Sequence, residues 1–154
     1  MGTLLLYILQ IKGSRKTDID YLSIHIAFYL ASWGMYRGLS FLLQKDYKIH
    51  IPVVKVILKP KYNSLCGIRC VGFREESNQI LLAELNGFMA SYYDEIRREV
   101  KEQDLKNKRS DTLLTKILMG TLGCMPAYDR YLSMGLRKVK SQQDKKYKIF
   151  DDAG

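Results

Sequence analysis

Residues 17–43, TDIDYLSIHIAFYLASWGMYRGLSFLL, decide the fold of this 154-residue chain. Thr17 followed three residues later by Asp20 has the spacing of a capping box, which marks the start of a helix. The stretch contains no proline, and Gly34 and Gly38 are tolerable in a helix that is held by packing. We therefore predict one long central helix that begins at Thr17 and continues to the end of the stretch, at Leu43.

The next apolar segment, residues 50–58, is short and its type is less clear. Pro52 stands where the first turn of a helix tolerates proline, and Lys59-Pro60 ends the segment. Its valines and isoleucines are β-branched, so a short strand is the alternative. Residues 61–74 show no regular pattern and predict a connection.

Three further helices are predicted in the second half of the chain. Ser77 or Asn78 caps a long amphipathic helix whose apolar residues recur at three- and four-residue spacing. Ser110 or Asp111 caps the next one. Pro126 then occupies the first turn of a last helix, which runs to about residue 135. Together these segments predict an all-α protein, a compact bundle of about five helices around the central one.

The length of the chain favours a single helical domain over residues 1–136, followed by a polar, lysine-rich tail over residues 137–154. The three cysteines, Cys66, Cys70 and Cys124, are too few and odd in number for a secreted disulfide framework, so we expect a reducing, cytoplasmic location. The uncharged residues 21–36 fall short of the roughly twenty that cross a bilayer. Extending them brings in Arg37, so we expect no membrane partner.

Two faces of the predicted central helix differ in chemistry at 100° per residue. One carries a stripe of small residues, Ala27, Ala31, Gly34 and Gly38, which lets another helix or a second copy of the chain approach closely. The opposite face gathers His25, Tyr29 and Tyr36, with Arg37 beside it. These groups can exchange protons, donate hydrogen bonds and hold a phosphate or carboxylate. The alternative is that they are core residues whose polar tips satisfy one another.

Asp129 and Arg130 follow the corner at residues 123–126 and are further candidates for a catalytic or ligand-binding group. An internal salt bridge that closes the helix pair is the alternative for these two residues. The chain lacks the glycine-rich phosphate loops, the nucleophile elbow and the zinc-protease pair of histidines. Cys66 and Cys70, with Cys124 and a histidine, could be imagined as a metal site, but a second metal-type pair is missing. We therefore expect neither a metal nor a cofactor, and whether the chain is an enzyme stays open.

Charge gives the remaining indication of function. Against 16 acidic residues the chain has 25 Lys and Arg, a net charge of +9. A cluster with one interleaved aromatic residue lies in the tail: Arg137, Lys138, Lys140, Lys145, Lys146, Tyr147 and Lys148. Such clusters attract phosphates irrespective of sequence, and an aromatic residue can stack on a base. We therefore predict a non-enzymatic module that binds nucleic acid or an acidic partner. The alternatives are a small enzyme or ligand-binding domain that uses the His25 face, a homo-oligomeric bundle, and a tail that only aids solubility.

Overall fold

The computed structural model describes residues 18–38, 40–100 and 111–151, with side chains described through residue 140. These residues contain α-helices and 3-10 helices and no strand, so the predicted all-α fold is confirmed for them. The α-helices are α2 (Ile19–Ser32), α3 (Ile51–Ile57), α4 (Glu76–Val100), α5 (Asp111–Thr121) and α6 (Arg130–Asp151). Short 3-10 helices connect them: η1 (Phe41–Gln44), η2 (Tyr47–His50), η3 (Pro60–Leu65) and η4 (Cys70–Arg74).

Helix α2 is shorter than the predicted central helix. Its N-cap is Asp18, whose carboxylate accepts the backbone N–H of Tyr21 at 3.0 Å; Thr17 lies outside the described residues. At the other end Gly34 has a φ of +68°, which a right-handed helix cannot contain. The N–H groups of Gly34 and Met35 bond back to the last turn at 2.8 and 3.0 Å, in the pattern of a Schellman motif. The prediction of a helix through Leu43 was therefore wrong.

The apolar segment that was predicted as either a helix or a short strand is helical. Residues 51–57 are helical with Pro52 in the first turn, so the strand alternative is wrong. Val53, Val54 and Ile57 are buried against the rest of the bundle. Because the predicted connection over residues 61–74 contains η3 and η4, it is more regular than expected.

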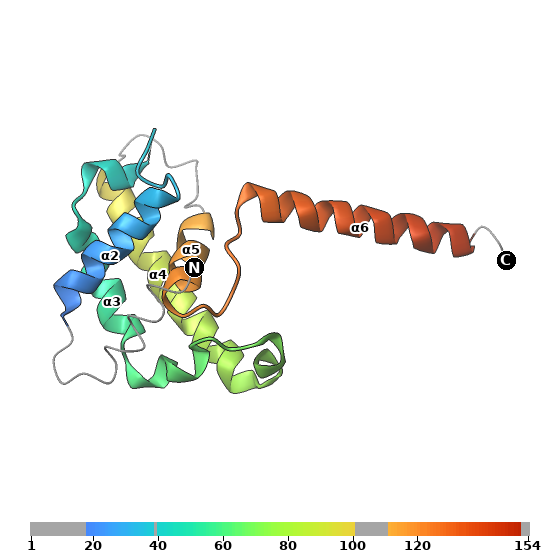
Figure 1. Ribbon diagram of the computed structural model, residues 1–154, viewed down its shortest axis with the longest axis horizontal. Helices are drawn as coiled ribbons and strands as arrows, with labels where there is room; N and C mark the ends of the chain where they lie inside the picture. Colours follow the sequence, from blue (N-terminus) through green and yellow to red (C-terminus); the bar gives the residue numbers. More distant parts are fainter. Residues whose placement is uncertain (1–17, 39, 101–110, 152–154) are drawn as a thin grey trace.

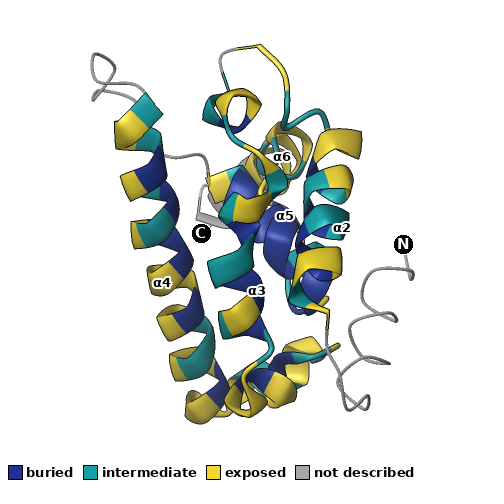
Figure 2. Ribbon diagram, turned by 90° about the vertical axis from the view of Figure 1, so that its left-hand side faces the viewer, coloured by how far each residue is buried: buried dark blue, intermediate teal, exposed yellow. Residues whose placement is uncertain are grey.

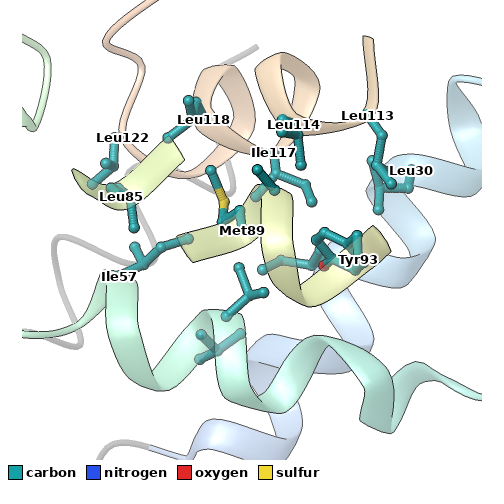
Figure 3. Packing of buried hydrophobic residues seen from close by; sticks show 14 of the residues in the cluster. Leu30, Ile57, Leu85, Met89, Tyr93, Leu113, Leu114, Ile117, Leu118 and Leu122 are labelled. Carbon is teal, nitrogen blue, oxygen red and sulfur yellow. The ribbon is translucent and has the colours of Figure 1, made fainter. Parts of the chain in front are cut away.

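Helices α4 and α5 were placed correctly to within three residues at their N-termini. Helix α4 begins at Glu76, before the predicted caps, and the Asn78 side chain instead donates to the Gly72 carbonyl at 3.0 Å. Seven of the eleven residues of α5 are buried, which puts this helix at the centre of the bundle. Figure 3 shows Ile117 and Leu118 of α5 packed with Leu85 and Met89 of α4.

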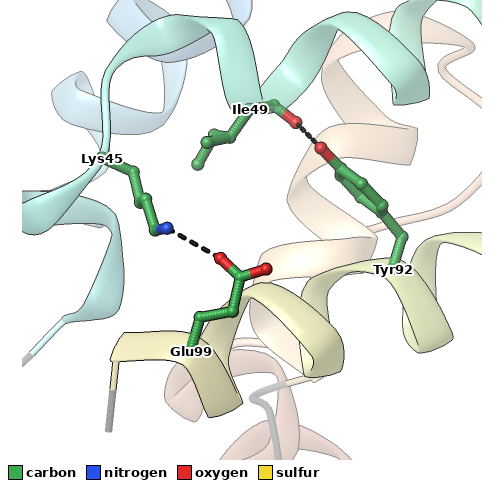
Figure 4. Close-up of polar contacts among 4 residues, drawn as sticks. All are labelled: Lys45, Ile49, Tyr92 and Glu99. Carbon is green, nitrogen blue, oxygen red and sulfur yellow. Dashed lines mark hydrogen bonds and ion pairs between the residues drawn. The ribbon is translucent and has the colours of Figure 1, made fainter.

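The bundle is arranged around α5. Figure 2 shows α3 between α4 and α2, with the mostly buried α5 behind them. Near its C-terminal end α4 is fixed to the segment before α3 by two polar contacts (Figure 4). Lys45 pairs with Glu99 at 2.9 Å, and the hydroxyl of Tyr92 donates to the Ile49 carbonyl at 2.8 Å. No helix of the described chain is long and apolar enough to cross a membrane.

Helix α6 differs most from the prediction. Residues 124–129 form a non-helical corner, so the helix predicted to start at Pro126 begins instead at Arg130. It continues through Gly135 to Asp151, and the predicted domain boundary at 136/137 falls inside it. The corner is held on α5, because Thr115 accepts the N–H of Tyr128 at 2.8 Å and Thr112 donates to the Tyr128 carbonyl at 2.7 Å. From there α6 leads away from the bundle (Figure 1).

Candidate functional site

The residues predicted to share one face of the central helix lie in separate places. His25 packs edge-on against Tyr21, with ring centroids 4.3 Å apart. Tyr29 stands one turn further along α2, whereas Tyr36 and Arg37 lie beyond the turn at Gly34. The small-residue stripe is also broken, since its two glycines adopt positive φ in that turn instead of lying on a helix. The structure therefore does not bring the four candidates together.

Tyr36 is half-buried and hydrogen-bonds into a row of three polar side chains whose other two members, His50 and Tyr93, are buried. Its hydroxyl lies 2.8 Å from Nε2 of His50, and Nδ1 of the same ring lies 2.7 Å from the hydroxyl of Tyr93. Burial lowers the pKa of His50 to about 4 and raises the pKa of Tyr36 to about 12. The imidazole is thus neutral, with one nitrogen donating and the other accepting. The polar atoms of all three side chains have hydrogen-bond partners, and the His50–Tyr93 bond links η2 to α4.

Arg37 and Asp129, two of the predicted candidates, both act electrostatically on a residue that the prediction missed. This residue is Lys116 of α5, whose side chain points into the α2–α5 contact and is only 5% exposed. Its ammonium lies 4.6 Å from the centroid of the Trp33 ring, within the range of a cation–π interaction. Burial lowers the pKa of Lys116, the Asp129 carboxylate partly opposes this effect, and the Arg37 charge makes a smaller contribution that lowers the pKa further.

A close helix crossing builds this cluster. Tyr29 and Trp33 are one turn apart at the end of α2, and Lys116 and Gly120 are one turn apart on α5. The Tyr29 ring covers Gly120 so closely that a β-carbon there would lie 2.5 Å from a ring carbon. The hydroxyl oxygen of Tyr29 is buried and has no hydrogen-bond partner among the described residues. Glycine at position 120 therefore permits the approach that places Trp33 over Lys116.

This close approach predicts opposite effects for two glycine substitutions in helices. Gly87→Ala on α4, where a β-carbon meets nothing within 4 Å, should stabilise the protein by up to about 1 kcal/mol through helix propensity. Gly120→Ala should destabilise it by about 1 kcal/mol or more, because the overpacked Tyr29 ring must move. Urea unfolding of the two variants measures both effects, and a stabilised Gly120→Ala protein would contradict the described crossing.

A groove lies on the other side of α5. It has a volume of about 420 Å³ and is bordered by η4, α4 and α5. Leu82, Leu114 and Met125 line its apolar wall, while Asp111 and Tyr128 add polar groups. Sequence reasoning could not find this groove, because the corner that closes it returns to α5 through tertiary hydrogen bonds. None of the predicted candidate residues lines it.

Cys124 does not have the properties of a reactive thiol. Cys124 is buried, and burial raises the pKa of its thiol to about 11, so it is protonated at neutral pH and is a poor nucleophile. Within the described parts of the chain no three His, Cys, Asp or Glu side chains are grouped so as to hold a metal ion.

The predicted basic tail is part of α6. Arg137, Lys138 and Lys140 are exposed on this helix. Lys145, Lys146, Tyr147 and Lys148 lie in its C-terminal half, where side chains are outside the described set. Arg130, the other candidate after the corner, lies at the start of α6 with its guanidinium 5.5 Å from the Tyr131 ring centroid.

Helix α6 also exposes large apolar side chains, none of which was among the predicted binding residues. Tyr131, Met134, Leu136 and Val139 are 74%, 58%, 53% and 53% exposed. An apolar surface of this kind, on a helix that leads away from its own bundle, is typical of a binding surface.

Comparison of the chain with family models, with curated proteins and with solved structures finds no match.

Proposed function

We propose that this chain is a non-enzymatic binding module that uses α6 to dock into the apolar groove of an acidic protein. One observation carries the proposal: the same projecting helix exposes both cations and large apolar side chains (Figure 1). Basic amphipathic helices are recognised in this way by acidic partners whose grooves are apolar.

The apolar side chains of α6 point in two directions. At 100° per residue, Leu132, Leu136 and Val139 fall within an arc of roughly 60°. Tyr131 and Met134 fall on a second arc, roughly 80° or more away from the first. A groove that encloses the helix covers both arcs, whereas a flat membrane surface covers one. This distribution favours a protein partner over a membrane surface.

The positive charge of α6 and of the whole chain favours a partner with a negative charge. Arg130, Arg137 and Lys140 are exposed between the apolar arcs, and the whole chain carries +9. Pairing α6 with a second copy of itself would bring these like charges together, which disfavours a homodimer through this helix. A nucleic acid would satisfy the cations and leave the apolar side chains uncovered. An acidic protein groove accommodates both.

The proposal predicts calcium-dependent binding of calmodulin, used here as a probe with an acidic surface and a methionine-rich apolar groove. Fluorescence anisotropy of labelled calmodulin, titrated with the full chain, measures the dissociation constant. Val139→Asp on α6 should weaken binding by about tenfold or more, because it puts a charge into the apolar contact. Val71→Asp is the matched control. Val71 is 67% exposed on η4, so its substitution should leave binding unchanged.

Two outcomes would overturn the proposal. The first is the absence of calcium-dependent binding, or an equal loss in both valine variants. The second is binding of duplex DNA or RNA that weakens steeply with salt and in Arg137→Glu but is insensitive to Val139→Asp. That second pattern would favour the nucleic-acid alternative.

A further inference from the structure

The ammonium of Lys116 is a buried charge with incomplete compensation. Among the residues that the structure describes, no carboxylate lies within ion-pair distance of it. Removing an ammonium from water costs more free energy than a cation–π contact returns. The Trp33 ring therefore offsets only part of the cost of burying Lys116.

The neighbouring charges do not remove this imbalance. Arg37 adds a second positive charge; its guanidinium packs on Gly34, where Nε would lie 2.9 Å from a β-carbon. Asp129 is the nearby acid, but its Oδ1 already accepts the N–H of Leu132 at 2.9 Å at the start of α6. Among the described residues, the cluster therefore has two cations against one carboxylate, and one oxygen of that carboxylate is already engaged. An anion bound between the cations would supply the missing compensation.

We propose that Arg37 and Lys116 bind a phosphate group beside Trp33. Arginine offers a planar fork of donors to phosphate oxygens, and lysine adds a point charge, so the two cations match a phosphate dianion. Arg37 and Trp33 are exposed and give access from solvent, while Lys116 forms the buried end of the site. This site shares no residue with the docking surface of α6, so its test is independent of the proposed function.

Trp33 is the only tryptophan of the chain and reports directly on the site. Titration of the full chain with sodium phosphate at constant ionic strength should change its fluorescence in a saturable manner. Arg37→Gln and Lys116→Met should each raise the phosphate concentration at half-saturation by about tenfold or more, because each removes a charge-assisted contact. Lys55→Gln, at an exposed position of α3, is the control and should titrate like the unmodified chain.

Three results would overturn the assignment. They are a fluorescence that does not saturate with phosphate, an unchanged half-saturation in Arg37→Gln, and an equal response to acetate at the same ionic strength. Arg37 is exposed, so its variant keeps the test decisive if Lys116→Met fails to fold.

Discussion

The free energy of unfolding is expected to fall by about 3 kcal/mol from His50 alone as the pH drops from neutral to 4. The pKa of His50 is lowered by burial from 6.5 to about 4 in the folded chain. Between these values the unfolded state binds the proton and the folded state does not. The stability is therefore fully present above pH 6.5 and is lost as the pH falls toward 4.

His50→Gln identifies the source of this pH dependence. The variant is less stable at neutral pH, because the hydroxyls of Tyr36 and Tyr93 lose their shared partner. Its loss of stability between pH 6.5 and 4 should nevertheless be smaller by the His50 contribution. Urea unfolding at a series of pH values measures the unmodified chain and the variant. An unchanged pH dependence of the free energy of unfolding in His50→Gln would contradict the buried, neutral state of His50.

Two leucine substitutions are expected to differ in their effect on stability, because one lies in the buried bundle and the other on the exposed surface of α6. Leu118→Ala should cost about 2–5 kcal/mol, since Leu118 is fully buried at the centre of α5 and its truncation leaves a cavity. Leu136→Ala, on the exposed surface of α6, should change stability by no more than about 0.5 kcal/mol. Thermal or urea unfolding measures the pair. A cost of 2 kcal/mol or more at Leu136 would show that α6 packs on the bundle.

Local signals predicted most of the helices. The apolar spacing of α4 and α5 specifies helices whatever surrounds them, and Pro52 marks the first turn of α3. The end of α2 was not predictable in the same way. Gly34 is compatible with a helix interior, and only the bonds back to the last turn fix its positive φ. The last helix was predicted to end at about Gly135, but α6 continues through this residue.

The candidate sites were predicted in part. Arg37 and Asp129 were chosen for their chemistry, and the structure places both near Lys116. Lys116 itself was missed, because a lysine in an amphipathic helix normally reaches solvent. Its burial depends on the crossing of α2 and α5. The His50 contacts join residues 14 and 43 positions apart, which no local pattern indicates.

The central claim is that α6 is the part of the chain that engages a partner. Hydrogen exchange of the full chain, with and without calcium-loaded calmodulin, tests it most directly because it locates the contact. The claim predicts that amides within residues 130–140 become protected on binding while those of α4 and α5 change little. Protection confined to the bundle, with α6 exchanging at the same rate in both samples, would contradict it.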